Sequence, residues 1–302
     1  AGVVTVPPKD HIREKGAMDA GVILGSKPEA VDIGKLYRPS KMHKLETPVL
    51  RESEFRGLVV PGHTDNLKSI ILDTSFLGTT KKEHDEHIEK LTREAIRIAR
   101  EGKFPIIVLS DRNVTTDDRR QYVEMPMAVG IIARALHKAG LYRSVSIVCD
   151  TGSALEAHDI GVLVSEGAHA VNPYAMWQAA SANIMNAYIV EKLEDGSPKR
   201  RPMTPGEIEE NIYSSLKAQV KKIYSKTGTL STRGFLNSKQ FEAVGMSGFL
   251  TSYYLRGAKS KVSGIWIEDI LEDQIERKKR GRDNRFRTRA RRRAGTAFSF
   301  EL

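Results

Sequence analysis

Acidic or amide side chains follow four of the apolar segments of this chain. They are Asp73, Asp111, Asp150 and Asn172. If these segments are parallel β-strands, their carboxyl ends lie along one rim of a sheet, which is where α/β folds bind ligands. Three carboxylates and an amide on one rim would suit a Mg²⁺ ion or acid–base catalysis. The alternative is that each side chain caps the following helix or shapes its turn, which is the more frequent role of an aspartate between a strand and a helix.

A polar segment at 226–232 is a second candidate site. Its four relevant residues are Lys226, Gly228, Ser231 and Thr232. Backbone N–H groups and the lysine ammonium could bind a phosphate there. A plain polar loop, or a contact with another domain, is the alternative, because the sequence has neither a Gly-x-Gly-x-x-Gly motif after a strand nor a Gly-Lys-Ser/Thr phosphate loop.

The histidines and the single cysteine form no diagnostic metal motif. His84 and His87 fall on what reads as an exposed, charged helix face, and His158 and His169 have no thiolate at a zinc-binding spacing. Cys149 lies within an apolar run, which favours a buried structural thiol over a nucleophile. We therefore assign no catalytic, cofactor-binding or metal-binding residue from these patterns.

The elements that must position these residues alternate along the chain. Short apolar runs predict strands at 69–76, 104–110, 144–149 and 170–171. Apolar residues spaced by three or four predict helices around 88–98, 123–137 and 154–165, and Gly102 is predicted to end the first. Strands that alternate with helices predict an α/β fold of parallel βα units, in the manner of a partial or degenerate TIM barrel.

A mainly helical part is predicted to follow. Residues 175–192 read as one helix, and residues 195–205 read as a polar loop. Thr204 is a predicted N-cap, with Pro205 at the first helical position and Glu207 at the third. The predicted organisation is an N-terminal wrap of short helices and extended segments at 1–68, a parallel βα core at 69–175, a helical part of the same domain at 176–272, and a basic tail at 273–302.

The net charge of +10 is concentrated in that tail. Residues 276–293 contain 11 Lys or Arg and 2 acidic residues. This low-complexity composition predicts disorder from residue 277 to 293. Such a tail would attract nucleic acid by counterion release, although Phe286 alone offers an aromatic ring for stacking. Solvated disorder without a nucleic-acid partner is the simpler interpretation.

Composition places the chain among ordinary soluble proteins. Hydrophobic residues make up 40% of it and charged residues 28%. No apolar run approaches the roughly 20 residues that cross a bilayer, so no membrane partner is expected. With one cysteine and no visible targeting segment, we expect a cytoplasmic protein, with an organelle as the alternative.

Eight short segments, taken in order, resemble the central domain of the glutamate synthase large subunit. They are 7–14, 45–50, 108–112, 150–152, 167–174, 226–232, 241–245 and 260–265. Pro-Pro-Lys-Asp-His-Ile-Arg-Glu at 7–14 is similar to that family's Pro-Pro-Ile-Asp-Pro-Ile-Arg-Glu, and Val-Leu-Ser-Asp-Arg at 108–112 matches the family's own segment. The sequence departs from the family at Asp150, where glutamate is usual, and by one inserted residue in 226–232.

The resemblance implies a connecting domain, a scaffold between an amidotransferase domain and an FMN-binding domain. The family makes glutamate from glutamine and 2-oxoglutarate with FMN and an iron–sulfur cluster. One cysteine cannot supply the thiolates of that cluster, so the chain alone is expected to bind neither cofactor and not to be catalytic. Two other functions stay open at this stage. They are a stand-alone α/β enzyme with a metal on the Asp rim, and a nucleic-acid-binding protein that acts through its tail.

Overall fold

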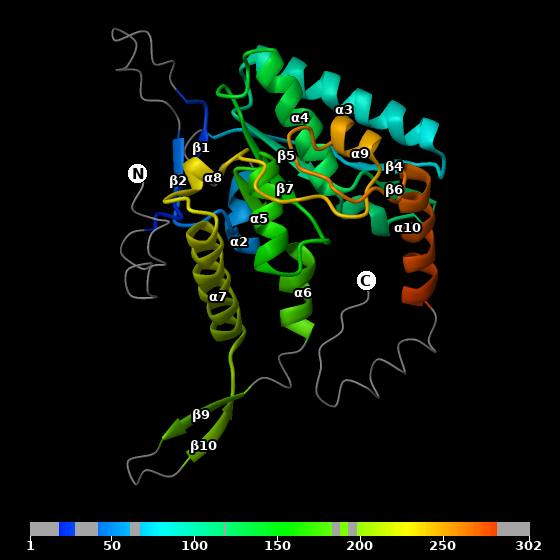
Figure 1. Cartoon of the computed structure of the whole chain (residues 1–302). Helices are drawn as coiled ribbons and strands as arrows, with labels where there is room; N and C mark the ends of the chain where they lie inside the picture. Colours follow the sequence, from blue (N-terminus) through cyan, green and yellow to red (C-terminus); the bar gives the residue numbers. More distant parts are fainter. Residues whose placement is uncertain are drawn as a thin grey trace, which may run out of the picture.

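A four-stranded parallel sheet lies at the centre of the protein (Figure 1). The computed structural model describes residues 18–27, 42–60, 67–117, 119–182, 188–192 and 198–282. In spatial order the strands are β3 (Ser69–Asp73), β5 (Ile106–Ser110), β7 (Ser146–Asp150) and β8 (Ala170–Asn172). Spatial order therefore equals chain order, as in an arc of a βα barrel, and the predicted α/β fold of parallel βα units is confirmed.

The sheet is apolar on both faces, as expected for strands covered on both sides. Residues alternate between two clusters, so that Ile107 and Leu109 pack on one face while Ile106 and Val108 pack on the other. The register places Val108 beside Ile71 on one side and Val148 on the other. Both central strands, β5 and β7, are buried throughout.

Three helices cover the first face: α3 (Lys81–Glu101), α4 (Met125–Lys138) and α5 (Ala157–Glu166). Thr80 caps α3 by accepting a hydrogen bond from the Glu83 N–H, and Glu83 reaches back to the Thr80 backbone. Gly102 ends α3 at φ 66°, a conformation that glycine adopts without strain, as predicted. Helix α4 is buried on most sides because α3, α5 and the sheet surround it.

The second face is covered by elements that precede the sheet. A hairpin of β1 (Val22–Gly25) and β2 (Met42–Leu45) packs there with α2 (Glu52–Val59). Part of the expected N-terminal wrap, residues 1–17, 28–41 and 61–66, lies outside the described residues, as does the motif at 7–14.

The predicted strand 69–76 divides into two at Thr74. The Thr74 N–H and hydroxyl both donate to the Ser110 carbonyl, at 2.8 and 3.0 Å, and this turns the chain away from the sheet. β4 (Ser75–Leu77) then pairs antiparallel with β6 (Arg120–Tyr122). A 3₁₀ turn, η2 (Arg112–Thr115), lies between β5 and β6 in the chain.

The predicted single helix at 175–192 is wrong. Helix α6 (Tyr174–Ala182) ends early, and β9 (Tyr188–Lys192) pairs antiparallel with β10 (Pro198–Pro202) where a polar loop was expected. The run Tyr-Ile-Val at the start of β9 combines aromatic and β-branched residues, which favour a strand. The next helix, α7 (Pro205–Lys226), begins with the predicted Thr204 capping box.

Three helices complete the described chain: α8 (Thr232–Phe235), α9 (Gly248–Tyr253) and α10 (Ile267–Arg282). The prediction of disorder from residue 277 is wrong as far as Arg282, because α10 continues to that residue. Ion pairs at four-residue spacing, Arg277 with Asp273 and Arg280 with Glu276, stabilise these turns. The rest of the basic tail lies outside the described residues. Within the described part, no helix is both long and apolar enough to span a membrane.

Candidate functional site

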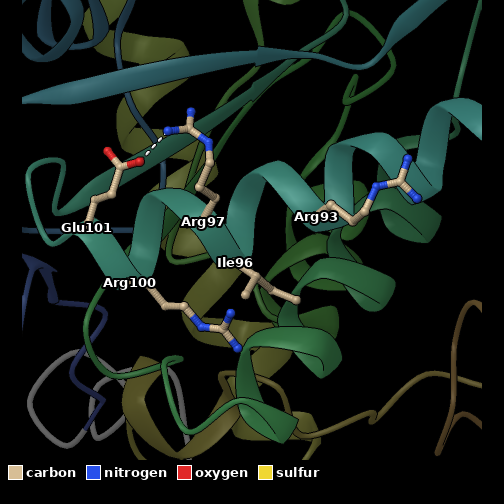
Figure 2. A pocket seen from close by; sticks show the side chains of 5 residues that line it. All are labelled: Arg93, Ile96, Arg97, Arg100 and Glu101. Atoms are coloured by element: carbon tan, nitrogen blue, oxygen red, sulfur yellow. Dashed lines mark hydrogen bonds and ion pairs between the residues drawn. The ribbon is translucent and has the colours of Figure 1, made fainter.

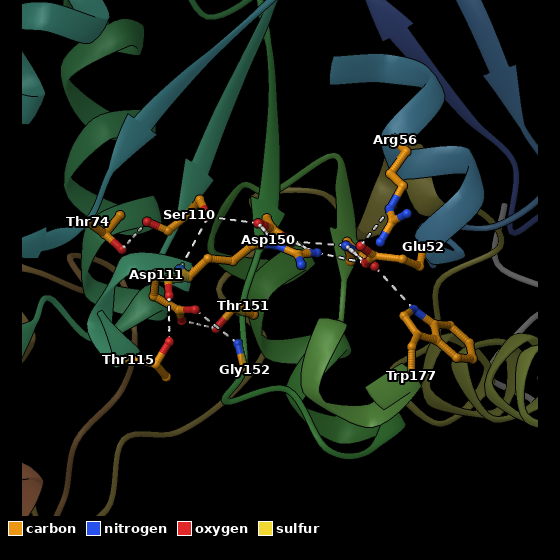
Figure 3. A network of polar contacts seen from close by, with 12 residues as sticks. Glu52, Arg56, Thr74, Ser110, Asp111, Thr115, Asp150, Thr151, Gly152 and Trp177 are labelled. Atoms are coloured by element: carbon orange, nitrogen blue, oxygen red, sulfur yellow. Dashed lines mark hydrogen bonds and ion pairs between the residues drawn. The ribbon is translucent and has the colours of Figure 1, made fainter. Parts of the chain in front are cut away.

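Three of the four predicted rim residues meet at the carboxyl edge of the sheet. Asp111 and Asp150 lie there (Figure 3), and Asn172 donates a hydrogen bond to Asp150. Asp150 and Asn172 end the neighbouring strands β7 and β8, and Asp111 directly follows β5. All three side chains are buried. Asp150 and Asn172 form one network with Arg112 of η2 and Glu52 of α2, and Asp111 lies beside this network.

A guanidinium group is the centre of this network. Arg112 donates from Nε to Asp150 Oδ2 at 2.7 Å and from Nη2 to Asp150 Oδ1 at 2.9 Å. Its Nη2 also donates to Glu52 Oε2 at 2.7 Å. The guanidinium lies over the Tyr174 ring, 4.5 Å from the centroid, so an aromatic face and two carboxylates fix its orientation.

Asn172 extends the network to helix α6. Its Nδ2 donates to Asp150 Oδ1 at 2.9 Å and to Glu52 Oε2 at 3.0 Å, and its Oδ1 accepts from Trp177 Nε1 at 3.1 Å. Burial alone would raise the pKa of the Glu52 carboxyl, but the hydrogen bonds from Asn172 and Arg112 and the charge of Arg112 lower that pKa below its usual range. Glu52 is therefore the ionised partner of Arg112.

Asp111 is held separately by the turn after β7. Its Oδ2 accepts from Thr151 Oγ1 at 2.5 Å and its Oδ1 from the Gly152 N–H at 3.1 Å, and the Tyr174 hydroxyl donates to it as well. A Cβ at position 152 would lie 2.8 Å from Tyr174 Oη, so the glycine makes room for that ring. Burial raises the pKa of Asp111 to about 6, against the lowering effect of these hydrogen bonds.

Asp73, the fourth rim residue, has partners of its own. Its Oδ1 accepts from the Ser75 N–H and hydroxyl at 2.9 and 2.6 Å, and its Oδ2 accepts from Asn113 Nδ2 and Arg120 Nη1. These contacts shape the turn between β3 and β4. Asp73 therefore has the turn-forming role that was the alternative to ligand binding.

The rim is arranged for internal pairing. Arg112 and Asn172 supply hydrogen-bond donors to both oxygens of Asp150, so a cation at that carboxylate would have to displace a guanidinium. Among the described residues, no three His, Cys, Asp or Glu side chains come together as a metal-binding group. The sequence reasoning missed Arg112 and Glu52. The one sequence feature that pointed to Arg112 is its place in the motif Val-Leu-Ser-Asp-Arg at 108–112.

Several polar groups of the segment 226–232 form hydrogen bonds within the protein. The Thr232 N–H donates to the Asp19 carbonyl at 3.0 Å, and its hydroxyl donates to the Ala20 carbonyl at 2.9 Å. Ser231 caps α8 through the Gly234 N–H, and Gly228 adopts φ 72° in the turn that ends α7. Thr232 therefore ties the helical part to the N-terminal part, whereas Ser231 caps α8. The hydroxyls of both residues already have hydrogen-bond partners, so they give no support to an anion site.

Three of the remaining titratable candidates, His84, His169 and Cys149, are buried. His84 is buried, with 1% of its surface exposed, beside Phe76 and Tyr254, so its predicted place on an exposed face is wrong. His169 Nδ1 accepts from the Ile147 N–H at 3.1 Å. Cys149 is buried and burial raises the pKa of its thiol well above the usual value, which agrees with the predicted structural thiol.

A groove lies apart from the rim, along the outer face of α3 (Figure 2). Its lining residues are Arg93, Ile96, Arg97, Arg100 and Glu101. Arg97 pairs with both Glu94 and Glu101, and Arg93 pairs with Glu89 at 3.5 Å. Since carboxylates of the same helix neutralise much of its positive charge, this groove is a weak candidate for an anion site.

The sequence comparisons agree with one another. Residues 2–247 match the model described as glutamate synthase central domain. The glutamate synthase [NADPH] large chain of Bacillus subtilis is 28% identical over 278 residues, which are 91% of this chain and 17% of that protein. The glutamate synthase [NADH] of Schizosaccharomyces pombe is 28% identical over 92% of this chain and 13% of its own length.

A plant relative gives the same result. The ferredoxin-dependent glutamate synthase 2, chloroplastic, of Arabidopsis thaliana is 26% identical over 90% of this chain and 16% of its own length. The chain therefore spans about a sixth of the curated relatives it matches. Among solved structures, inosine 5' monophosphate dehydrogenase from Legionella pneumophila aligns with 64% of this chain and 69% of that chain, at 13% identity and a TM-score of 0.35.

Proposed function

The chain belongs to the glutamate synthase central domain family, and we propose that it acts as the connecting domain of a glutamate synthase. The match of residues 2–247 to the family model carries this proposal. The proposed partners are an amidotransferase domain and an FMN-binding domain, in the same polypeptide or in another. The proposed reaction of the assembled enzyme is the formation of glutamate from glutamine and 2-oxoglutarate.

The network at the sheet edge supports a scaffolding role. Through Arg112 and Asn172 it joins α2, which precedes the sheet, to the ends of β5, β7 and β8. Trp177 of α6 joins the same network and also donates to the Leu50 carbonyl at 3.1 Å. Segments far apart in the sequence are thereby held as one unit, which is what a spacer between two catalytic domains requires.

The single cysteine and the described part of the segment 226–232 argue against cofactor binding by this chain. An iron–sulfur cluster needs several accessible thiolates, whereas Cys149 is the single cysteine and is buried as a thiol. The hydroxyls of Ser231 and Thr232 already have partners within the protein. We therefore place FMN and the cluster on other parts of the proposed enzyme and derive no catalytic step from this chain.

The cytoplasm is the proposed compartment, and an organelle is the alternative because the Arabidopsis relative is described as chloroplastic. Nucleic-acid binding through the basic tail would be a separate function, and no contact among the described residues favours it over the family assignment.

Reconstitution from separate parts tests the proposal. The purified chain is mixed with FMN, and bound flavin is followed by fluorescence and glutamate by its release. The chain alone is expected to bind no FMN and form no glutamate, whereas addition of amidotransferase and FMN-binding portions of a glutamate synthase is expected to give activity that depends on the chain. A flavin-coloured, glutamate-forming protein obtained from this chain alone would overturn the proposal.

A further inference from the structure

Helix α10 covers one edge of strand β6 (Figure 1). Gln274 is 2% exposed and forms two hydrogen bonds with the backbone of Tyr122. Its Oε1 accepts from the Tyr122 N–H at 3.3 Å, and its Nε2 donates to the Tyr122 carbonyl at 3.1 Å. About one helical turn further, Lys278 donates to the Arg120 carbonyl. Side chains of α10 therefore take the place of a neighbouring strand along β6.

The spacing of these contacts suits a helix that lies along a strand. Gln274 and Lys278 are four residues apart, so they share one face of α10 and lie about 6 Å apart along its axis. Arg120 and Tyr122 are two residues apart on β6, a distance of about 6.6 Å along a strand, and their backbone groups point to the same side. The two periods match closely enough for both contacts to form at once.

The contacts close an edge that β4 does not cover. On the β4 side, the Val123 N–H donates to the Thr74 carbonyl at 3.0 Å. Because backbone groups alternate between the two sides of a strand, those of Tyr122 face away from β4. An unpaired edge of this kind is a template for pairing with another strand, and a helix that covers it prevents such pairing.

The two halves of α10 are held differently. In the first half, Ile267 and Leu271 are each 2% exposed and belong to the main core, and Glu268 pairs with Lys81 of α3 at 3.9 Å. Leu271 is the last buried apolar side chain among the described residues of the helix, and Ile275 is only partly buried. The second half is therefore held mainly by polar contacts, and segments of that kind open at a lower free energy than the core.

A carboxylate lies under the second half. Gln274 Nε2 donates to Glu124 Oε1 at 3.0 Å, and the Tyr122 hydroxyl also donates to this carboxylate. The charged groups that face Glu124 are Arg277 and Asp273 of α10, which pair with each other. Burial raises the pKa of Glu124 above its usual value, against the lowering effect of the hydrogen bonds and of Arg277.

We propose that the second half of α10, residues 274–282, is a strap that opens and closes over the edge of β6 while the first half stays anchored. In the closed state, Gln274 and Lys278 complete the hydrogen bonds of β6. In the open state, the same backbone groups are accessible to water or to an added strand. The strap is a motion of this chain, and it does not depend on the proposed function.

Residue-resolved hydrogen exchange, measured by NMR on the full chain, tests the strap. The amides of 275–282 and of Tyr122 are expected to share one opening constant, at least ~10-fold larger than that of the amides before Leu271. Gln274→Ala removes both hydrogen bonds to Tyr122. It is expected to raise exchange of the Tyr122 amide and of the strap at least ~5-fold, with the amides of β7 unchanged.

Two adjacent lysines provide a matched control. Lys278→Met keeps most of the aliphatic chain and removes the ammonium that donates to Arg120, so it is expected to raise exchange of the strap. Lys279→Met is the same replacement at the next residue, which is exposed, and it is expected to leave exchange unchanged. If Gln274→Ala does not fold, this pair of variants decides the test.

The pH dependence of opening gives a second readout. Since closing raises the pKa of Glu124, the closed state keeps a proton that the open state releases, and the opening constant should rise with pH above the usual carboxyl range. The rise is limited to about 10-fold per pH unit, after correction for intrinsic exchange. Glu124→Gln keeps an acceptor oxygen for Gln274 and is expected to abolish this pH dependence.

The outcomes either confirm or overturn the strap. A common opening of 275–282 that Gln274→Ala and Lys278→Met accelerate, and Lys279→Met does not, would confirm it. Exchange of these amides only on global unfolding, or at the same rate as the first half, would overturn it. Equal effects of the two lysine variants would overturn it as well.

Discussion

Arg112 and Asp150 form a two-pronged ion pair, with Nε donating to Oδ2 at 2.7 Å and Nη2 to Oδ1 at 2.9 Å. The Asp150 side chain is 1% exposed, so the pair satisfies a carboxylate that has no access to water. The same guanidinium reaches Glu52, which lies 60 residues earlier in the sequence. This contact explains how a turn after β5 binds the N-terminal part to the sheet.

Replacement of Arg112 by lysine is expected to destabilise the protein. A lysine ammonium cannot make the two parallel hydrogen bonds to Asp150, and it leaves buried acceptors unpaired, so the free energy of unfolding should fall by about 2–4 kcal/mol. Urea unfolding measures this change. Arg119→Lys is the matched control, because that arginine pairs with Asp117 while 80% exposed and should change stability by less than about 0.5 kcal/mol. Equal effects of the two variants would contradict the role of the network.

Asp111 should make the protein less stable as pH rises through its titration. Its pKa is raised from 3.8 to about 6, so between these values the folded state binds more protons than the unfolded state, and the free energy of unfolding falls with increasing pH. Asp111→Asn is expected to remove this decline, which amounts to about 1–3 kcal/mol between pH 4 and pH 7. Urea unfolding at several pH values measures it, and an unchanged pH profile would refute the assignment.

His169 should make the protein less stable as pH falls, which is the opposite of the effect of Asp111. Burial, aided by the charge of Lys27, lowers its pKa from 6.5 to about 3, so the unfolded state binds the proton first and stability is lost as pH falls below 6.5. An asparagine side-chain oxygen can accept the Ile147 N–H in place of Nδ1. His169→Asn is therefore expected to reduce acid destabilisation between pH 6.5 and pH 4 by up to about 1.4 kcal/mol per pH unit. His158→Asn is a control at a histidine outside this site, and identical profiles for all three proteins would contradict the prediction.

Gly130 should tolerate no side chain. A Cβ at this position of α4 would lie 2.4 Å from the Tyr254 carbonyl oxygen and 3.1 Å from Glu166 Oε2. Gly130→Ala is expected to lower the free energy of unfolding by about 2–4 kcal/mol, because backbone must move to relieve the contact. Gly206→Ala, in the first turn of α7 where a Cβ meets nothing within 4 Å, should be neutral or stabilising by about 0.5–1 kcal/mol. Thermal or urea unfolding of both variants checks the contrast.

The strands of the sheet could be predicted from the sequence because they are buried on both faces. Ile106 to Ser110 and Ser146 to Asp150 read as continuous apolar runs, and their ends located Asp111, Asp150 and Asn172 correctly. Their partners could not be found in this way. Arg112 stands in a 3₁₀ turn and Glu52 on a distant helix, and only tertiary structure brings them together.

Errors arose where packing overrode local pattern. His84 lies on a highly charged helix, but Tyr254, which directly follows α9, packs beside it, and His84 is buried. The apolar residues after Ala182 continue a helical spacing, so the sequence does not predict the hairpin of β9 and β10. The hairpin pairs Tyr188 with Pro202, and a local sequence pattern does not reveal a contact between residues so far apart. Composition predicts disorder from Arg277 onward, yet Arg277 and Arg280 pair with acidic residues four positions earlier, and α10 continues to Arg282.

A chimeric enzyme tests the central claim most directly. In the Bacillus subtilis glutamate synthase large chain, the segment aligned with this chain is replaced by this chain, and glutamate formation from glutamine and 2-oxoglutarate is measured. We predict activity that a matched protein lacking the segment does not have. A soluble chimera that carries its flavin and cluster yet forms no glutamate would contradict the assignment of this chain as a connecting domain.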